Sequence, residues 1–189
     1  MNKQESKYAA TASLMDEALL LLLEKKELAA ITVKELCEKA GVNRTTFYLH
    51  YENMHDLLEE TIEMINKKFL DSLSNVNGIN HKKEVLTNEK YLKPYLNLIK
   101  ENRRAYRVIH QKGNLFNIQK TFNALYETIF SPALSNFKVS EKEKKYVFAF
   151  YTQGTMAIIG QWLDGNCEDD VDMIMDLIMR HTQTYENNR

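Results

Sequence analysis

The stretch TVKELCEKAGVNRTTFYLHYENMHDLL, residues 32–58, decides the fold. Thr32 is followed three residues later by Glu35, the spacing of a capping box at a helix start. Ala40-Gly41 ends this helix, because glycine readily adopts the left-handed conformation that closes one. Asn43 is the predicted N-cap of a second, short helix. Two helices joined by a short turn that contains glycine predict a helix-turn-helix.

The short second helix has one inner and one outer face. Phe47 and Tyr51 are four residues apart and therefore point to the same side, toward a core. The outer face and its flanks then carry Arg44, Thr45, Thr46, Tyr48, Leu49 and His50. No carboxylate occurs between Lys39 and Tyr51. Hydrogen-bond donors without competing carboxylates suit phosphate oxygens, and Leu49 can contact thymine methyl groups. This face suits the major groove of DNA.

A purely structural role is the alternative interpretation of this motif. Residues 1–55 contain seven Lys or Arg and eight Asp or Glu, so the segment is not a basic domain. On spacing alone, a helix-turn-helix of this kind can also be ordinary packing, and both interpretations stay open.

Helical spacing dominates the remaining chain. Only 6 Gly and 2 Pro are present, which disfavours the many turns of an all-β fold. Besides the two helices above, the sequence predicts helices at about 5–28, 52–73, 89–99, 103–109, 115–130, 140–163 and 168–185, with a loop at 75–88. The expected fold is all-α, with about nine helices and no strand.

Composition excludes several classes of protein. Cys37 and Cys167 are isolated and lack the CxxC spacing of a metal or redox site, so we expect reduced thiols. The N-terminus lacks the apolar segment of a signal peptide. The longest apolar run, Leu19 to Leu23, is far shorter than the roughly 20 residues of a membrane span. These features predict a cytoplasmic protein that does not enter a membrane.

The quoted stretch resembles the DNA-binding signature of the TetR/AcrR family of bacterial transcription regulators. The resemblance rests on Thr32, Ala40-Gly41-Val42, Asn43, Phe47-Tyr48 and His50-Tyr51, followed by Leu57. Residues 148–178 are similar to the last two helices of one branch of that family. The resemblance implies a DNA-binding domain at 1–52 and a regulatory and dimerisation domain at 53–189. A long fourth helix would connect the two.

The resemblance also implies roles for individual residues. Tyr48 and His50 would hold backbone phosphates, as would Thr32 and Asn43 at the helix starts. Arg44, Thr45 and Thr46 would read bases, and Leu49 would contact a methyl group. The family usually carries a lysine near the start of helix 4, where this chain has Met54 beside His55. Phosphate anchoring is then weaker, or is taken over by His50, His55 or the N-terminal Lys3 and Lys7.

Two further groups of residues follow from the family pattern. Candidates for an effector pocket are the aromatic side chains Phe69, Tyr95, Tyr106, Phe116, Phe122, Tyr126 and Phe150. Each is also a candidate for ordinary core. The expected dimer interface comprises Phe150, Gly154, Ala157, Ile158, Gln161, Val171, Ile174, Met175 and Ile178. The predicted helix at 140–163 has more apolar surface than the core of one chain needs, which favours an interface between two chains. Packing within the core of one chain remains an alternative.

No catalytic or metal-binding pattern stands out. His50 and His55 are five residues apart, whereas two ligands on one helical face need a spacing of four. The acidic residues Glu168, Asp169 and Asp170 are best explained as complements to the positive end of the last helix. The charged run at 141–145 is expected to be a solvated helix face. We therefore expect no enzyme activity, no metal and no cofactor.

The leading hypothesis is a dimeric repressor. It would bind a near-palindromic operator in double-stranded DNA, with recognition helices about 34–36 Å apart or a multiple of that. A small-molecule effector or a protein partner would favour a dimer whose helices no longer span both half-sites. The alternative is a transcriptional activator, or a helical interaction module whose C-terminal domain binds another protein.

Overall fold

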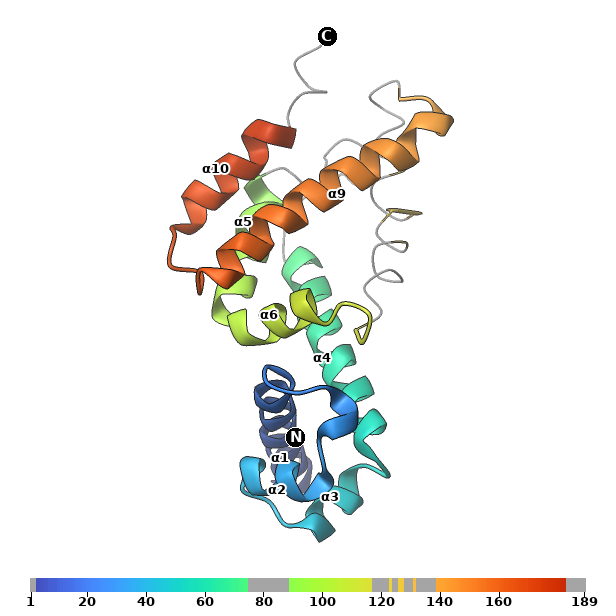
Figure 1. The fold of residues 1–189 in the computed structure, drawn as a ribbon, viewed down its shortest axis with the longest axis vertical. Helices are drawn as coiled ribbons and strands as arrows, with labels where there is room; N and C mark the ends of the chain where they lie inside the picture. Colours follow the sequence, from blue (N-terminus) through green and yellow to red (C-terminus); the bar gives the residue numbers. More distant parts are fainter. Residues whose placement is uncertain are drawn as a thin grey trace. The chain divides into compact units, whose positions relative to one another are not determined.

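The computed structural model describes residues 3–74, 89–116, 123, 126–127, 131 and 139–182. Within this part of the chain all regular structure is helical, which confirms the all-α prediction (Figure 1). The helices are α1 (Lys3–Leu23), η1 (Leu28–Ala30), α2 (Val33–Ala40), α3 (Arg44–His50), α4 (Met54–Ser74), α5 (Glu89–Glu101), α6 (Arg103–Gln111), α9 (Glu141–Asp164) and α10 (Val171–Thr182). Most of the helix predicted at 115–130 lies outside the described residues.

The described chain forms two compact units, Met1–Lys67 and Lys68–Arg189. The boundary between them falls within α4, whereas the sequence suggested a division after residue 52. The domain boundary therefore stays a prediction, because compactness does not establish which segment folds independently. No described helix combines the length and apolar character that a membrane span requires.

The first unit is built around the buried face of α1. Met15, Leu19 and Leu23 are fully buried on this helix, and α2 packs against it while α3 packs against α2. Phe47 of α3 is 0% exposed and Leu36 of α2 is equally enclosed. The two residues that were expected to face the core, Phe47 and Tyr51, are therefore both buried.

The first helix ends earlier than predicted, at Leu23 instead of about Leu28. Its apolar pattern stops there, and the next residues are charged. The amides of Lys25 and Lys26 both bond the carbonyl of Leu22, which tightens the chain into a turn. A short 3-10 segment then leads into α2.

The start of α2 confirms only half of the predicted capping box. Thr32 is the N-cap, and its hydroxyl accepts a hydrogen bond from the backbone N–H of Glu35 at 3.2 Å. The Glu35 carboxylate instead pairs with Lys26 in the preceding turn. A full positive charge within reach is a stronger partner for a carboxylate than a backbone amide.

The second unit has its core where α5, α9 and α10 meet. The shared residues are Leu92, Leu96, Ile99, Ile159, Trp162, Leu163, Cys167, Val171, Ile174, Met175 and Ile178. The indole Nε1 of Trp162 donates to the carbonyl of Asp169 at 3.1 Å, so that its polar atom is satisfied at the edge of this core. Cys37 and Cys167 are both buried and free, as expected for reduced thiols.

Arginine side chains of α6 form hydrogen bonds with the carboxyl end of α9 and the turn after it. Arg107 donates from Nε and Nη2 to the carbonyl of Leu163, at 3.1 and 2.9 Å, and from Nη2 to Asn166 Oδ1 at 3.0 Å. Arg103 Nε reaches the same Asn166 oxygen at 3.2 Å. A guanidinium suits this place, because the last carbonyls of a helix lack intrahelical donors. Gly160 of α9 allows the close approach, since a Cβ there would lie 2.5 Å from the His110 ring.

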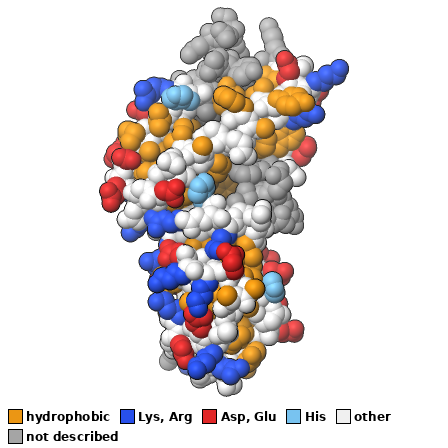
Figure 2. All heavy atoms as spheres, in the orientation of Figure 1, with side chains coloured by type: hydrophobic (Ala, Val, Ile, Leu, Met, Phe, Trp, Pro, Cys, Tyr) orange, Lys and Arg blue, Asp and Glu red, His pale blue; other side chains and the backbone are white. Residues whose placement is uncertain are grey.

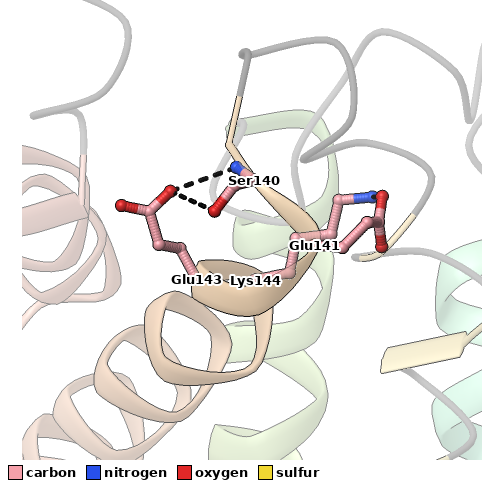
Figure 3. A network of polar contacts seen from close by, with 4 residues as sticks. All are labelled: Ser140, Glu141, Glu143 and Lys144. Carbon is pink, nitrogen blue, oxygen red and sulfur yellow. Dashed lines mark hydrogen bonds and ion pairs between the residues drawn. The ribbon is translucent and has the colours of Figure 1, made fainter.

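The start of α9 has a capping box, and it corrects a prediction about charge. The capping box of Ser140 and Glu143 is present, and the Glu143 carboxylate accepts from both the N–H and the hydroxyl of Ser140 (Figure 3). Residues 141–145 were expected to be solvated, but Lys144 is only 2% exposed. Its ammonium pairs with Glu141, which is exposed. A buried ammonium requires such a partner, because leaving water without one is costly.

Candidate nucleic-acid interface

The N-terminus of α3 is held by two of the residues expected to touch DNA. Asn43 is its N-cap, and Asn43 Oδ1 accepts from the backbone N–H of Thr46 at 2.7 Å. The Thr46 hydroxyl donates to the same oxygen at 2.9 Å. Thr46 is half-buried. Its hydroxyl proton is therefore donated within the protein, and of the three predicted base readers Arg44 and Thr45 are the more exposed.

Four of the predicted residues form an open face on α3. Arg44 and Thr45 are exposed, Tyr48 is 53% exposed and Leu49 is 75% exposed. The helix buries Phe47 on one side and leaves Leu49, a large apolar group, mostly open to solvent on the other. The face combines a cation, a hydroxyl, a phenol and an isobutyl group. This set can donate to phosphates and bases and can also contact a methyl group.

The carboxyl end of α3 brings His50 against α1. The His50 and Tyr8 rings stack with their centroids 3.8 Å apart and their planes 17° apart. Burial lowers the pKa of His50, and the charge of Glu60 acts in the opposite direction. His50 therefore tends toward the neutral form at pH 7. Its neighbour Tyr51 is buried, and burial, followed by the charges of Asp16 and Glu60, raises the pKa of Tyr51.

At the start of α4, where the resemblance led us to compare Met54 with a lysine, this chain has an acidic cap. The Asp56 carboxylate accepts from the backbone N–H groups of Glu52 and Asn53, at 2.9 and 3.2 Å, and from Asn53 Nδ2 at 3.0 Å. Asn53 Oδ1 in turn accepts from the His55 N–H at 2.7 Å. His55 itself is exposed. His55, the predicted phosphate contact on this helix, is therefore accessible to solvent.

Sequence reasoning missed a buried polar contact that ties α4 to α1. Thr61 is fully buried and donates its hydroxyl to Asp16 Oδ1 at 2.7 Å, while Asp16 is only 4% exposed. The signal was present, because Asp16 interrupts an otherwise apolar face of the first helix. Its partner could not be found from spacing, since Thr61 lies on another helix.

The predicted effector residues do not all come together. The ring of Phe69 lies 5.1 Å from that of Tyr95, which lies 6.2 Å from that of Tyr106. Burial raises the pKa of Tyr95 to about 12, and the hydroxyl of Tyr106 is buried without a hydrogen-bond partner among the described residues. Tyr126 instead contacts Phe148, at 5.0 Å.

The other predicted pocket residues differ in how deeply they are buried. Phe116 is 5% exposed, whereas Phe150 is 72% exposed and therefore lines no interior site. Phe122 lies outside the described residues.

The residues expected at a dimer interface divide into two groups. Phe150, Gly154, Ala157 and Gln161 are exposed along α9, and Ile158 is half-buried. Those on α10 already have partners within the chain, because they belong to the core with α5 and α9: Val171, Ile174, Met175 and Ile178. Among the large hydrophobic residues of α10, Met173 is exposed, at 44%. Figure 2 shows hydrophobic side chains on the visible surface of α9 and α10.

Comparison with known protein families identifies the family of this chain. Residues 17–61 match the family model described as bacterial regulatory proteins, tetR family. Residues 86–184, more than half of the chain, match a model of a transcriptional regulator C-terminal region of the same group. The chain belongs to the tetR family of transcriptional regulators. The resemblance noted in the sequence is thereby confirmed.

Individual relatives of this tetR-family regulator agree with that assignment. It is 29% identical over 153 residues to the uncharacterized HTH-type transcriptional regulator YxbF of Bacillus subtilis (strain 168), covering 78% of this chain. The aligned part spans only 38% of the length of YxbF.

Solved structures show the same fold. A TetR-like transcriptional regulator from Rhodococcus sp. RHA1 has a TM-score of 0.74 at 16% identity, over 96% of this chain and 98% of that one. The dihydroxyacetone kinase operon activator DhaS has a TM-score of 0.55 at 17% identity, over 91% and 93% of the two chains.

Proposed function

We propose that this tetR-family regulator is a homodimeric repressor in the cytoplasm that binds a near-palindromic operator through α3. The observation that carries the proposal is the exposed face of α3. Arg44, Thr45 and Leu49 project there without a carboxylate, on a helix fixed by a buried phenylalanine and an asparagine cap. The proposed phosphate contacts are Tyr48, His50, Thr32, Asn43 and His55. In a dimer the two faces would enter successive major grooves.

The experiment that tests this proposal is selection of the purified protein against random-sequence duplex DNA. Selection is carried out at about 150 mM salt, because weak electrostatic binding dominates at lower ionic strength. The selected duplex is then titrated beside a scrambled duplex. We expect a palindrome that binds on the order of 10³-fold more tightly than the scrambled control. Equal and salt-sensitive binding to both duplexes would contradict the proposal.

Arg44→Ala and Tyr48→Phe should separate base reading from phosphate binding. Arginine pairs best with guanine edges, so Arg44→Ala should cost about 1–3 kcal/mol on the selected duplex and much less on the scrambled one. Tyr48→Phe removes only a hydroxyl, so it should weaken binding to both duplexes alike, by about 1 kcal/mol. Fluorescence anisotropy titrations measure both. If Arg44→Ala leaves the preference for the selected duplex unchanged, Arg44 does not read bases.

Ala157→Arg should separate the dimer into monomers. Ala157 lies on the exposed side of α9 beside Gly154 and Gln161, where small side chains allow two helices to approach closely. An unpaired guanidinium buried there would cost several kcal/mol. Ser13→Arg, an equal charge change on the exposed side of α1, is the matched control. Analytical ultracentrifugation should find the control dimeric, and a dimeric Ala157→Arg variant would place the interface elsewhere.

For the effector, the group of Phe69, Tyr95 and Tyr106 supports a site in the second unit. The Tyr106 hydroxyl has no partner among the residues that the structure describes, and a buried hydroxyl in that state costs about 1–3 kcal/mol, which a ligand with one hydrogen-bonding group would recover. The flanking aromatic rings favour an apolar body on such a ligand.

Transcription from a promoter that contains the selected duplex distinguishes repression from activation. Addition of the regulator should lower transcript yield in a purified system, because a dimer on the operator would exclude RNA polymerase. A rise in transcript yield would favour activation, the role that the name of the structural relative DhaS assigns to that protein.

A further inference from the structure

We propose that Tyr8 is a positioning residue for operator binding: it holds the His50 ring so that Nε2, as a neutral N–H group, donates to a DNA backbone phosphate. This inference rests on the proposed function, since it presupposes that α3 binds DNA. No pattern in the sequence links Tyr8 to His50, which lie on different helices.

The first step is the geometry of the two rings. With centroids 3.8 Å apart and planes 17° apart, the tyrosine lies flat against the imidazole. A flat contact of this kind restricts rotation of the imidazole out of its plane. Tyr8 itself is 48% exposed, so the stack sits at the surface of the first unit, at the end of the recognition helix.

The second step is the different surroundings of the two ring nitrogens. Nδ1 of His50 is enclosed and has no hydrogen-bond partner in the described part of the chain. His50 as a residue is half-buried, and of its two ring nitrogens only Nδ1 is an enclosed atom without a partner in the described part of the chain, so we infer that the edge with Nε2 reaches solvent. An enclosed N–H without an acceptor is rarer in proteins than an enclosed lone pair. The proton of the neutral ring therefore belongs on Nε2, the nitrogen that can meet a phosphate.

The third step is the charge of the ring. The described groups that act on it are Tyr8 of α1, Tyr51 beside it and Glu60 of α4. A charged imidazole would need a second N–H, at the enclosed Nδ1. Burial accordingly lowers the pKa of His50 and outweighs Glu60. Above its lowered pKa the ring is a neutral donor, which bonds a phosphate without releasing a counterion from the DNA.

The tautomer is tested on the full chain without DNA. Nitrogen-15 NMR of the histidine-labelled protein at pH 7.5 reports which ring nitrogen carries the proton, and His50→Gln identifies the His50 signals among the five histidines. We expect the neutral Nε2–H form in the unchanged protein and in Tyr8→Phe, which keeps the ring. In Tyr8→Ala we expect rapid averaging between the two tautomers. A fixed Nδ1–H form, or a charged ring, in the unchanged protein would overturn the inference.

DNA binding is then measured with the selected duplex. Tyr8→Ala should lower affinity about two- to tenfold, the value of one aromatic contact, while Tyr8→Phe should bind like the unchanged protein. Leu14→Ala, on an exposed position of the same helix, is the matched control and should have no effect. In a His50→Ala background Tyr8→Ala should have no further effect, because the ring it positions is gone.

The salt dependence checks the charge. His50→Ala should weaken binding without changing the slope of affinity against salt, whereas loss of a cationic contact would lower that slope by about one.

Three results of the DNA-binding measurements would overturn this inference while leaving the proposed function intact: equal losses in Tyr8→Phe and Tyr8→Ala, additive effects of the Tyr8 and His50 changes, or a reduced salt slope in His50→Ala. If the unchanged protein binds no duplex specifically, the proposed function fails first, and the phosphate role of His50 fails with it.

Discussion

Phe47→Ala should lower the free energy of unfolding of the first unit by about 3–5 kcal/mol, the usual cost of truncating a fully buried phenylalanine. Phe47 is 0% exposed and lies within ring-contact distance of Tyr51, which is buried as well. Removing it leaves α3 without its main apolar anchor. Urea denaturation followed by far-UV circular dichroism measures the change. Operator affinity should fall on the order of 100-fold, because fewer molecules hold α3 in place.

Leu49→Ala is the matched control on the same helix. Leu49 is 75% exposed, so its truncation should change stability by less than about 0.5 kcal/mol. It should still weaken binding to the selected duplex, because it removes the proposed methyl contact. A similar loss of stability in both variants would mean that α3 does not bury the face described above.

Trp162→Ala should destabilise the second unit by about 3–5 kcal/mol. Trp162 is 2% exposed in the core shared by α5, α9 and α10, and its indole also donates to the Asp169 carbonyl. The truncation therefore opens a cavity and removes one of the hydrogen bonds in the turn between α9 and α10. Denaturation is followed by circular dichroism at one fixed protein concentration, because subunit association would add to apparent stability.

Met173→Ala supplies the comparison for this unit. Met173 is 44% exposed on α10, so its loss should change stability by less than about 0.5 kcal/mol. If Trp162→Ala costs no more than about 1 kcal/mol, the three helices do not depend on this side chain for their packing.

Much of the local structure of α2 and α3 was predictable because its signals are local. The caps at Thr32 and Asn43 act on amides three residues away. Gly41 adopts a φ of 69°, a left-handed conformation that glycine accepts without strain. The burial of Phe47 and Tyr51 follows from their spacing on one short helix. Each of these features depends on a few consecutive residues, so one sequence is enough to find them.

Predictions failed where a local rule competed with a more distant partner. Glu35 completes a capping-box pattern, yet its carboxylate pairs with Lys26. Lys144 lies in a charged run, yet it is buried. The apolar residues of α10 suit a dimer interface or a core by spacing; Ile174 and Ile178 lie in the core with α5, and the dimer interface stays a prediction. Helical periodicity reports which residues share a face but not what covers that face.

The sequence by itself determined the helices, the turn between α2 and α3, the outward side of α3 and the family, because these depend on caps, periodicity and short motifs. Only the tertiary structure decided which residues of different helices contact one another. It brought Tyr8 onto His50 and Asp16 onto Thr61, and it fastened Arg107 to the end of α9. These contacts join residues on different helices, and their geometry is set by how the helices pack, which spacing along the chain does not encode.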